Sequence, residues 1–157
     1  MAKDDGFLKC IILTTRSELV MVPNAAVAEI VPVQDVSSTG SGPVWFLGIA
    51  RWRGVELPLV SYEAAAGIPV QNVNINTQVA VLYTVGESTE RKHPYVGLVI
   101  SGVPHVSRFT RDQIKPNLEV PNVHPMVAQK VRVNGAAVNI LDLGRIETML
   151  DEVASAA

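Results

Sequence analysis

The residues that could carry chemistry in this chain are few and lie far apart. The three histidines, His93, His105 and His124, are 12 and 19 residues apart, and with a single cysteine in the chain they match no metal-ligand motif. Each histidine adjoins a proline, which is typical of a turn. We therefore interpret all three as surface turn residues and predict neither a metal site nor a histidine base.

The other possible reaction centres are also incomplete. The single cysteine, Cys10, lies in an apolar segment, which indicates a buried and unreactive thiol. Gly40-Ser41-Gly42 resembles the start of a phosphate-binding loop but lacks the third glycine and the Lys-Ser/Thr pair, so we interpret it as a linker. No Gly-x-Ser-x-Gly sequence marks a serine nucleophile. The sequence thus predicts no catalytic residues, no cofactor and no metal.

Residues suited to binding are concentrated in segment 44–67, which reads VWFLGIARWRGVELPLVSYEAAAG. An apolar run leads into Arg51-Trp52-Arg53-Gly54, a second apolar run follows, and small residues close the segment. The pattern predicts a strand, a tight turn, a second strand and a short helix. Gly54 supplies the positive φ that such a turn needs.

The arginines of this segment suit a protein-docking surface. Arg51 and Arg53 are two residues apart, so an extended strand places them on one face, together with Leu47 and Ile49. Arginine and tryptophan are enriched in interface hot spots. The sequence is compatible with two roles for Trp52, an interface anchor and a core residue. It is also compatible with two roles for Arg53, an interface contact and a brace across the turn.

Composition excludes several classes of protein. The chain has 157 residues, 48% of them hydrophobic, which is enough for one packed domain and excludes general disorder. A net charge of −2 and an aromatic content of 5% argue against a nucleic-acid partner, including an oligonucleotide-binding barrel. No apolar stretch is long enough to span a membrane, and the acidic N-terminus does not resemble a signal peptide. We therefore expect a cytoplasmic protein without membrane insertion.

Turn residues punctuate the chain at the ~8–12-residue spacing of β-sandwiches and barrels. Asn134-Gly135 is the strongest hairpin signal. Only Asp142–Val153 has convincing helical periodicity, and we expect it to pack on its own domain. A short helix is predicted at Pro23–Ile30 and a helical turn at Thr110–Ile114. Strands are predicted at 8–15, 18–22, 31–33, on both sides of the turn at Gly54, and at 77–85, 95–100, 103–109, 127–133 and 136–141, with loops at 34–43, 67–76 and 86–93.

Segment 48–62 resembles the central motif of the CheW-like chemotaxis coupling domain, G-[VI]-[IV]-N-L-R-G-x-[VIL]-[VL]-P-[VL]-[VIL]-D-L. Both glycines, Arg53 and Pro58 match, whereas Arg51 replaces the usual Asn, Trp52 the usual Leu and Ser61 the usual Asp. Weaker likeness at 18–30, 95–103 and 138–146, where Ser101 stands in place of Asp, extends the resemblance over about residues 8–150.

The resemblance implies a single domain, 1–157, with an all-β fold. Two intertwined five-stranded, SH3-like barrel lobes share a core in that fold, with short helices and a C-terminal helix. It also implies a non-catalytic adaptor that couples the cytoplasmic tip of a chemoreceptor to the regulatory domain of a CheA-type histidine kinase, recruited to membrane-bound receptor arrays. The departures from the motif suggest an auxiliary member, as in a pilus-type system for twitching motility. The alternative is a small β-barrel that binds or converts a small molecule, but the sequence offers no convergent polar groups for it.

The expected interface combines the arginine turn with an apolar surface between the lobes. Because the family motif includes Arg53, an interface role is favoured for it. We expect Val27, Ile30 and Val31 to come from the first lobe and Leu47, Ile49 and Val99 to lie near the junction, beside Arg51, Trp52, Arg53 and Gly54.

Overall fold

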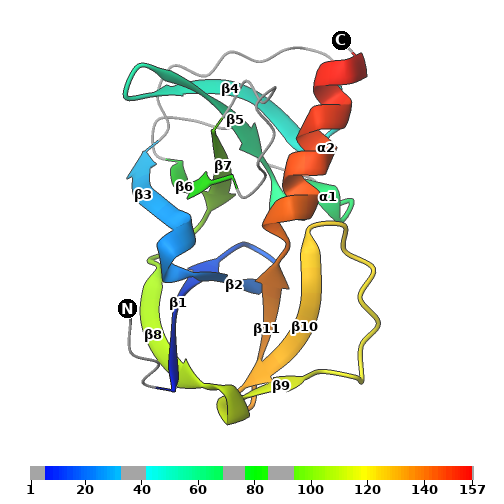
Figure 1. Cartoon of the computed structure of the whole chain (residues 1–157). Helices are drawn as coiled ribbons and strands as arrows, with labels where there is room; N and C mark the ends of the chain where they lie inside the picture. Colours follow the sequence, from blue (N-terminus) through cyan, green and yellow to red (C-terminus); the bar gives the residue numbers. More distant parts are fainter. Residues whose placement is uncertain (1–5, 33–41, 69–76, 85–93, 157) are drawn as a thin grey trace.

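The computed structural model describes residues 6–32, 42–68, 77–84 and 94–156, and forms two stacked β lobes (Figure 1). The inserted lobe is a five-stranded sheet in the order β3-β6-β7-β5-β4, and the terminal lobe is a six-stranded sheet in the order β8-β1-β2-β11-β10-β9. The strands are β1 (Phe7–Thr14), β2 (Leu19–Pro23), β3 (Val27–Pro32), β4 (Phe46–Trp52), β5 (Val55–Val60), β6 (Gln78–Tyr83), β7 (Tyr95–Ile100), β8 (His105–Thr110), β9 (Ile114–Pro116), β10 (Val127–Val133) and β11 (Ala136–Leu141).

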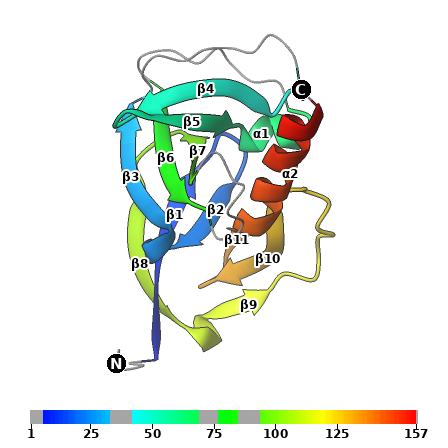
Figure 2. The ribbon, with the colours of Figure 1, turned by 45° about the horizontal axis from the view of Figure 1, so that its top comes forward.

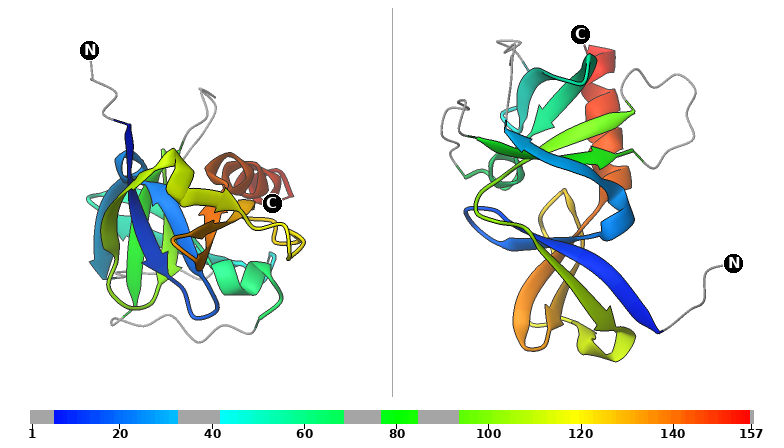
Figure 3. Two further views of the ribbon diagram at one scale, coloured as in Figure 1. Left: turned by 90° about the horizontal axis from the view of Figure 1, so that it is seen from below. Right: turned by 90° about the vertical axis from the view of Figure 1, so that its left-hand side faces the viewer.

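The chain builds the lobes in an interleaved order. It starts in the terminal lobe with β1 and β2, forms the whole inserted lobe with β3 to β7, and returns to complete the terminal lobe with β8 to β11. The right-hand view of Figure 3 shows the two lobes one above the other, with the C-terminal helix α2 (Leu143–Ala156) alongside the inserted lobe. The all-β, two-lobed fold is therefore confirmed, although one lobe has six strands rather than the expected five.

Several strands read as continuous apolar runs because both of their faces are buried. On β1, Ile11 and Leu13 point into a core shared by the two lobes, whereas Cys10 and Ile12 point into the interior of the terminal lobe. On β6, the same alternation separates Leu82, in the shared core, from Val81, in the interior of the inserted lobe. The two sheets therefore enclose three apolar clusters, namely the shared core and the interior of each lobe.

The shared core joins the two lobes and both α-helices. Leu13 from the terminal lobe and Leu98 from the inserted lobe are both fully buried in it. Tyr62, in the short helix α1 (Tyr62–Ala65), and Ile146, in α2, are equally inaccessible. The expected C-terminal helix is thus confirmed and packs on its own domain. Its buried face also contains Leu143, Met149 and Leu150.

The predicted helix at Pro23–Ile30 is wrong. Only the 3-10 turn η1 (Asn24–Ala26) is helical, and β3 follows at once. Val27, Ile30 and Val31 are β-branched, and pairing with β6 favours the extended form over a short amphipathic helix. Near residue 110 the predicted turn exists as η2 (Arg111–Gln113), but the short strand β9 after it was not predicted. The loops expected at 34–43, 67–76 and 86–93 lie mostly outside the described residues.

Gly97 allows close packing inside the inserted lobe. A Cβ atom built there would lie 2.7 Å from Leu59 Cδ2 and 2.8 Å from Val79 Cγ1, closer than real contacts allow. Both neighbours are buried, so they have little space into which to move. The absence of a side chain at Gly97 therefore lets β5, β6 and β7 approach.

Replacing Gly97 by alanine should destabilise the protein by roughly 1–3 kcal/mol, because the added methyl overpacks a closed interior. Gly144→Ala, in the first turn of α2, is the matched control: its Cβ would meet Asp142 Oδ1 at an ordinary 3.6 Å, and alanine favours the helix. Urea unfolding of the two variants measures both effects. A Gly97→Ala protein as stable as wild type would show that this packing is looser than described.

Candidate functional site at the seam of the inserted lobe

The inserted lobe is a curled sheet whose two edge strands, β3 and β4, do not pair within the described residues. Figure 2 shows β3 reaching the β4–β5 hairpin across this seam. A cavity of about 250 Å³ lies between the edges. Its apolar lining comes from Val31, Pro32, Ala50, Leu57, Leu59 and Val79, and its polar lining from Glu29, Arg51, Trp52 and Arg53.

The arginine turn forms one end of this seam. Trp52 pairs with Val55, so Arg53 and Gly54 alone make the turn, with φ values of 51° and 76°. Two positive φ values define the turn type whose twist matches a β-hairpin. The expected role of Gly54 is confirmed, and Arg53 adopts the left-handed region as well, which side chains other than glycine adopt at a cost. This geometry directs the Arg53 side chain back toward β3.

Glu29 of β3 joins the two edges of the seam through its side chain. Its Oε2 accepts a hydrogen bond from Trp52 Nε1 at 2.8 Å and forms an ion pair with Arg53 Nη2 at 3.1 Å. The Arg53 guanidinium also lies 5.2 Å from the centre of the Trp52 ring. Because the Arg53 side chain is 70% exposed, the pair contributes at most about 1 kcal/mol to folding. Arg53 therefore braces the seam and remains open to a partner.

Trp52 is half core residue and half surface residue. Its ring packs edge-to-face on Tyr95 with centroids 4.8 Å apart, and Tyr95 in turn lies 5.4 Å from Tyr83. Trp52 and Tyr95 pack against the apolar interior of the inserted lobe, whereas Tyr83 is 45% exposed. The indole is thus held in place by its lobe while its other side lines the seam cavity.

All ten residues predicted for the interface lie in the inserted lobe, but the structure brings only some of them together. Val31, Arg51, Trp52 and Arg53 line the seam cavity, and Gly54 adjoins them in the turn. The others are distributed over the lobe: Leu47 and Val99 pack against its interior, Val27 and Ile30 against the shared core, and Ile49 is half-buried on β4.

The six apolar candidates, expected in the first lobe and near the junction of the lobes, all belong to one sheet. Val27, Ile30 and Val31 belong to β3, in the same sheet as Leu47, Ile49 and Val99, because the chain leaves the terminal lobe after β2. Each of the six side chains is half-buried. Each therefore keeps some surface that a partner can contact, but none is strongly exposed. The most exposed large apolar side chains of the described residues lie elsewhere, among them Leu118, Val123, Val44 and Val103.

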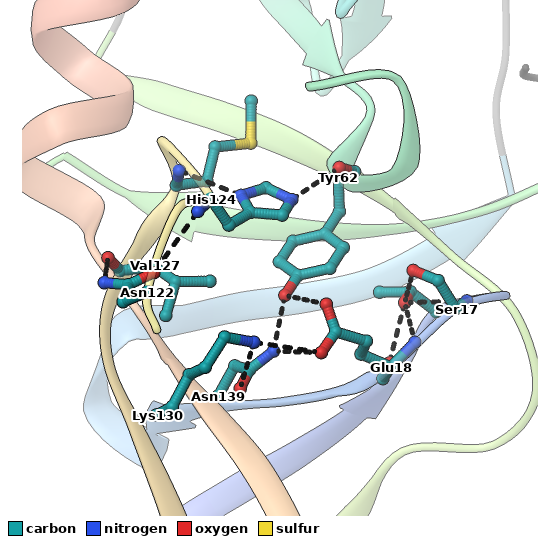
Figure 4. Close-up of polar contacts among 10 residues, drawn as sticks. Ser17, Glu18, Tyr62, Asn122, His124, Val127, Lys130 and Asn139 are labelled. Atoms are coloured by element: carbon teal, nitrogen blue, oxygen red, sulfur yellow. Dashed lines mark hydrogen bonds and ion pairs between the residues drawn. The ribbon is translucent and has the colours of Figure 1, made fainter. Parts of the chain in front are cut away.

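Sequence reasoning missed two features of the structure. The first is Glu29, whose signal was its position as the lone acid in the apolar strand VAEIVP. The second is a polar cluster beneath α1 (Figure 4). There the Tyr62 hydroxyl donates to Glu18 Oε1 at 3.1 Å, and Asn139 Nδ2 donates to both Glu18 Oε2 and the Tyr62 hydroxyl at 2.8 Å. Lys130 Nζ lies 3.2 Å from the same carboxylate.

This cluster ties the lobes together electrostatically. Burial alone would raise the pKa of Glu18, but hydrogen bonds from Asn139, Lys130 and Tyr62 outweigh it, and the pKa of this carboxyl is lowered. Burial raises the pKa of the Tyr62 hydroxyl well above its usual range, so it remains a donor. The negative charge of the Glu18 carboxylate is therefore balanced by three hydrogen-bond donors, one each from α1, β10 and β11.

His124 is buried, so its interpretation as a surface turn residue is wrong. Its ring stacks on Tyr62 with centroids 4.0 Å apart, Nε2 donates to the Tyr62 carbonyl oxygen at 2.8 Å, and Nδ1 accepts from the Met126 amide at 3.0 Å. Only the neutral ring can make both bonds. Burial, the main cause, lowers the pKa of His124. His105 is exposed as predicted, and His93 lies outside the described residues.

Within the described ranges, no group of three or more His, Cys, Asp and Glu side chains is arranged to hold a metal ion. None of the helices that the structure describes is long and apolar enough to cross a membrane. Cys10 is buried as predicted, and burial raises the pKa of its thiol. The seam itself offers an apolar cavity bordered by two arginines and one carboxylate.

Comparisons with known proteins agree with this geometry. The CheW-like domain family matches residues 9–149. No curated protein sequence matches the chain. Among solved structures, the scaffolding protein TtCheW from Thermoanaerobacter tengcongensis is similar at 18% identity and a TM-score of 0.69, covering 87% of this chain and 84% of that one. At this identity the structural likeness shows a common fold, and the family match covers nearly all of the chain.

His124 should make folding sensitive to mild acid. Its folded pKa lies below the unfolded value of about 6.5, so the unfolded chain binds the extra proton and stability falls as pH falls below that value. The slope from one proton is at most about 1.4 kcal/mol per pH unit. Urea unfolding between pH 7.5 and 5.5 should show this loss in wild type and a flatter profile for His124→Gln.

The His105→Gln variant, which removes an exposed imidazole, is the matched control. Comparing slopes rather than absolute stabilities separates the proton effect from any packing lost with the ring. Identical pH slopes in wild type and His124→Gln would contradict the assignment of a neutral, buried ring.

Proposed function

The chain belongs to the CheW-like domain family and is a non-catalytic chemotaxis adaptor; we propose that it couples chemoreceptors to a CheA-type histidine kinase. In this proposal, one surface binds the cytoplasmic tip of the receptor and another binds the regulatory domain of the kinase. The protein then acts within membrane-bound receptor arrays. The family match over residues 9–149 is the observation that carries the proposal.

The mechanism is thermodynamic rather than chemical. A scaffold that binds two partners lets the state of one bias the state of the other, as a coupling free energy between two sites. This requires a fixed relation between the two surfaces, since a flexible joint would average the bias away. The shared core supports such a relation, because it contains buried side chains from both lobes and from α2.

The seam of the inserted lobe is the surface we assign to a partner protein. Arg51 and Arg53 are exposed at its rim, and the half-buried Trp52 and Val31 border an apolar cavity between them. A guanidinium binds a carboxylate through two parallel hydrogen bonds, and an apolar pocket beside it gives a partner side chain a place to enter. The predicted interface residues outside the cavity, from Val27 to Val99, would form its periphery.

The departures from the family motif support assignment to an auxiliary, pilus-type chemosensory system. Ser61 replaces the usual Asp yet still caps α1, accepting a hydrogen bond from the Ala64 amide at 3.1 Å. Ser101 likewise retains a contact, 3.4 Å from the Thr14 carbonyl oxygen. Arg51 and Trp52, by contrast, change the surface of the seam itself. We infer that these two residues match a partner that differs from that of the typical family member.

The experiment that tests the proposal compares Arg53→Ala and Arg51→Ala. Arg53→Ala should weaken binding to the kinase regulatory domain or the receptor tip by roughly 2–5 kcal/mol, because it leaves a partner charge unpaired. Its cost to folding should be at most about 1 kcal/mol, as expected for an exposed ion pair. Arg51→Ala should lose less affinity and act mainly through salt-dependent association.

Arg132→Ala provides the matched control, because Arg132 forms a similarly exposed ion pair with Glu119 on the terminal lobe, at 3.2 Å. Titration calorimetry with the partners encoded by the same genome measures affinity, and thermal melts measure stability. If Arg53→Ala melts many degrees lower yet binds both partners normally, Arg53 is purely structural and the seam is not the interface.

A further inference from the structure

We propose that the terminal lobe binds an amphipathic carboxylic acid, with its acyl chain in the lobe interior and its carboxylate at Arg111. A cavity of about 470 Å³ opens into this lobe, bounded by β1, β2, β9, β11 and η2. Pockets that hold small molecules have volumes of about 300–1,000 Å³. The site lies on the lobe that does not carry the seam, so it goes beyond the docking surface proposed above.

The cavity has the lining that an acyl chain requires. Its walls are apolar side chains from four separate elements, including Leu8 of β1, Met21 of β2, Ile114 of β9 and Ile140 of β11. Leu8 is 40% exposed, so the cavity is reached from solvent along this side chain. Apolar lining of this extent favours a ligand with a hydrocarbon body rather than a sugar or a nucleotide.

The charges at the cavity determine the sign of the ligand. Arg111 lines it, and no Asp or Glu is among the described residues that do. Lys9 also borders it, but its side chain alternates with those of Leu8 and Cys10 and points to the other face of β1, beside Arg108. Asp112 follows Arg111 in sequence but does not line the cavity. A guanidinium beside an apolar cavity, with no carboxylate among the described lining residues, is complementary to an anionic head group.

The seam cavity offers the appropriate contrast. It measures about 250 Å³, and Glu29 lies in its lining. A carboxylate there would repel an anionic ligand, and the volume is below the usual range for small molecules. These two cavities therefore differ in size and charge, and that of the terminal lobe suits an acyl carboxylate better.

Cys10 provides a reporter inside the proposed site. It lines the cavity, it is 7% exposed, and it is the single cysteine of the chain. A bound acyl chain should therefore slow its alkylation by a small thiol reagent. Because burial raises the pKa of this thiol, labelling is best followed at mildly alkaline pH.

The test measures Cys10 alkylation and titration calorimetry of the full chain with octanoate, decanoate and dodecanoate. The dissociation constant should fall roughly fourfold per added methylene until the cavity is full. The acid concentration that half-protects Cys10 from alkylation should fall in parallel. Decanol has the same chain without the charge, so it should protect at least tenfold less well at equal concentration. Absence of protection by all three acids, or equal protection by decanol, would overturn the proposal.

Variants locate the head group and exclude other occupants. Arg111→Gln should weaken decanoate binding several-fold, whereas Lys9→Gln, on the other face of β1, should leave it nearly unchanged. Ile114→Glu should abolish binding by placing a carboxylate in the cavity. Ile68→Glu changes an exposed apolar residue outside the cavity and should have no effect. Protection of Cys10 that rises with protein concentration without ligand would show that a second copy fills the cavity, and would equally contradict the proposal.

Discussion

The apolar core shared by the two lobes is the constraint on which the rest of this structure depends. It takes one face of β1, β2, β5, β6 and β7, together with α1 and α2, so each lobe is stabilised by the other rather than by closing into a complete barrel. Tyr62 shows how tightly this is specified. Its ring is fully buried, its hydroxyl is bonded to Glu18 and Asn139, and His124 stacks on it. The inserted lobe can therefore leave its two edge strands unpaired within the described residues, which is what creates the seam.

Local patterns in the sequence predicted most of the elements. The apolar runs, the Asn134-Gly135 turn and the periodicity around Ile146 each carry a short-range signal that tertiary contacts did not override. Predictions failed where distant residues decide the outcome. β3 is extended because β6 pairs with it across an intervening segment, and His124 is buried because it stacks on a residue 62 positions earlier. Glu29 was missed for the same reason: its partners lie more than twenty residues away, at the hairpin turn.

The sequence predicted where the candidate site lies but not which apolar residues form it. The arginine turn was found because arginine, tryptophan and glycine at that spacing indicate a hairpin and a docking surface without further context. The apolar candidates could not be sorted, since a half-buried valine on an edge strand and a core valine have the same sequence signature. The structure separates them: Val31 borders the seam cavity, whereas Val27 and Ile30 pack on the shared core. In the proposed function, a rigid core holds this partly open edge at a fixed position, as coupling between two partners requires.

Hydrogen exchange measured with and without the kinase regulatory domain tests this account most directly. The account holds that a partner closes the seam between β3 and β4 while the shared core remains unchanged. Amides of segments 27–32 and 50–55 should exchange more slowly in the complex, and those around Leu13, Tyr62 and Leu98 should be equally protected in both states. Protection confined to the terminal lobe, or increased exchange in the shared core on binding, would contradict it.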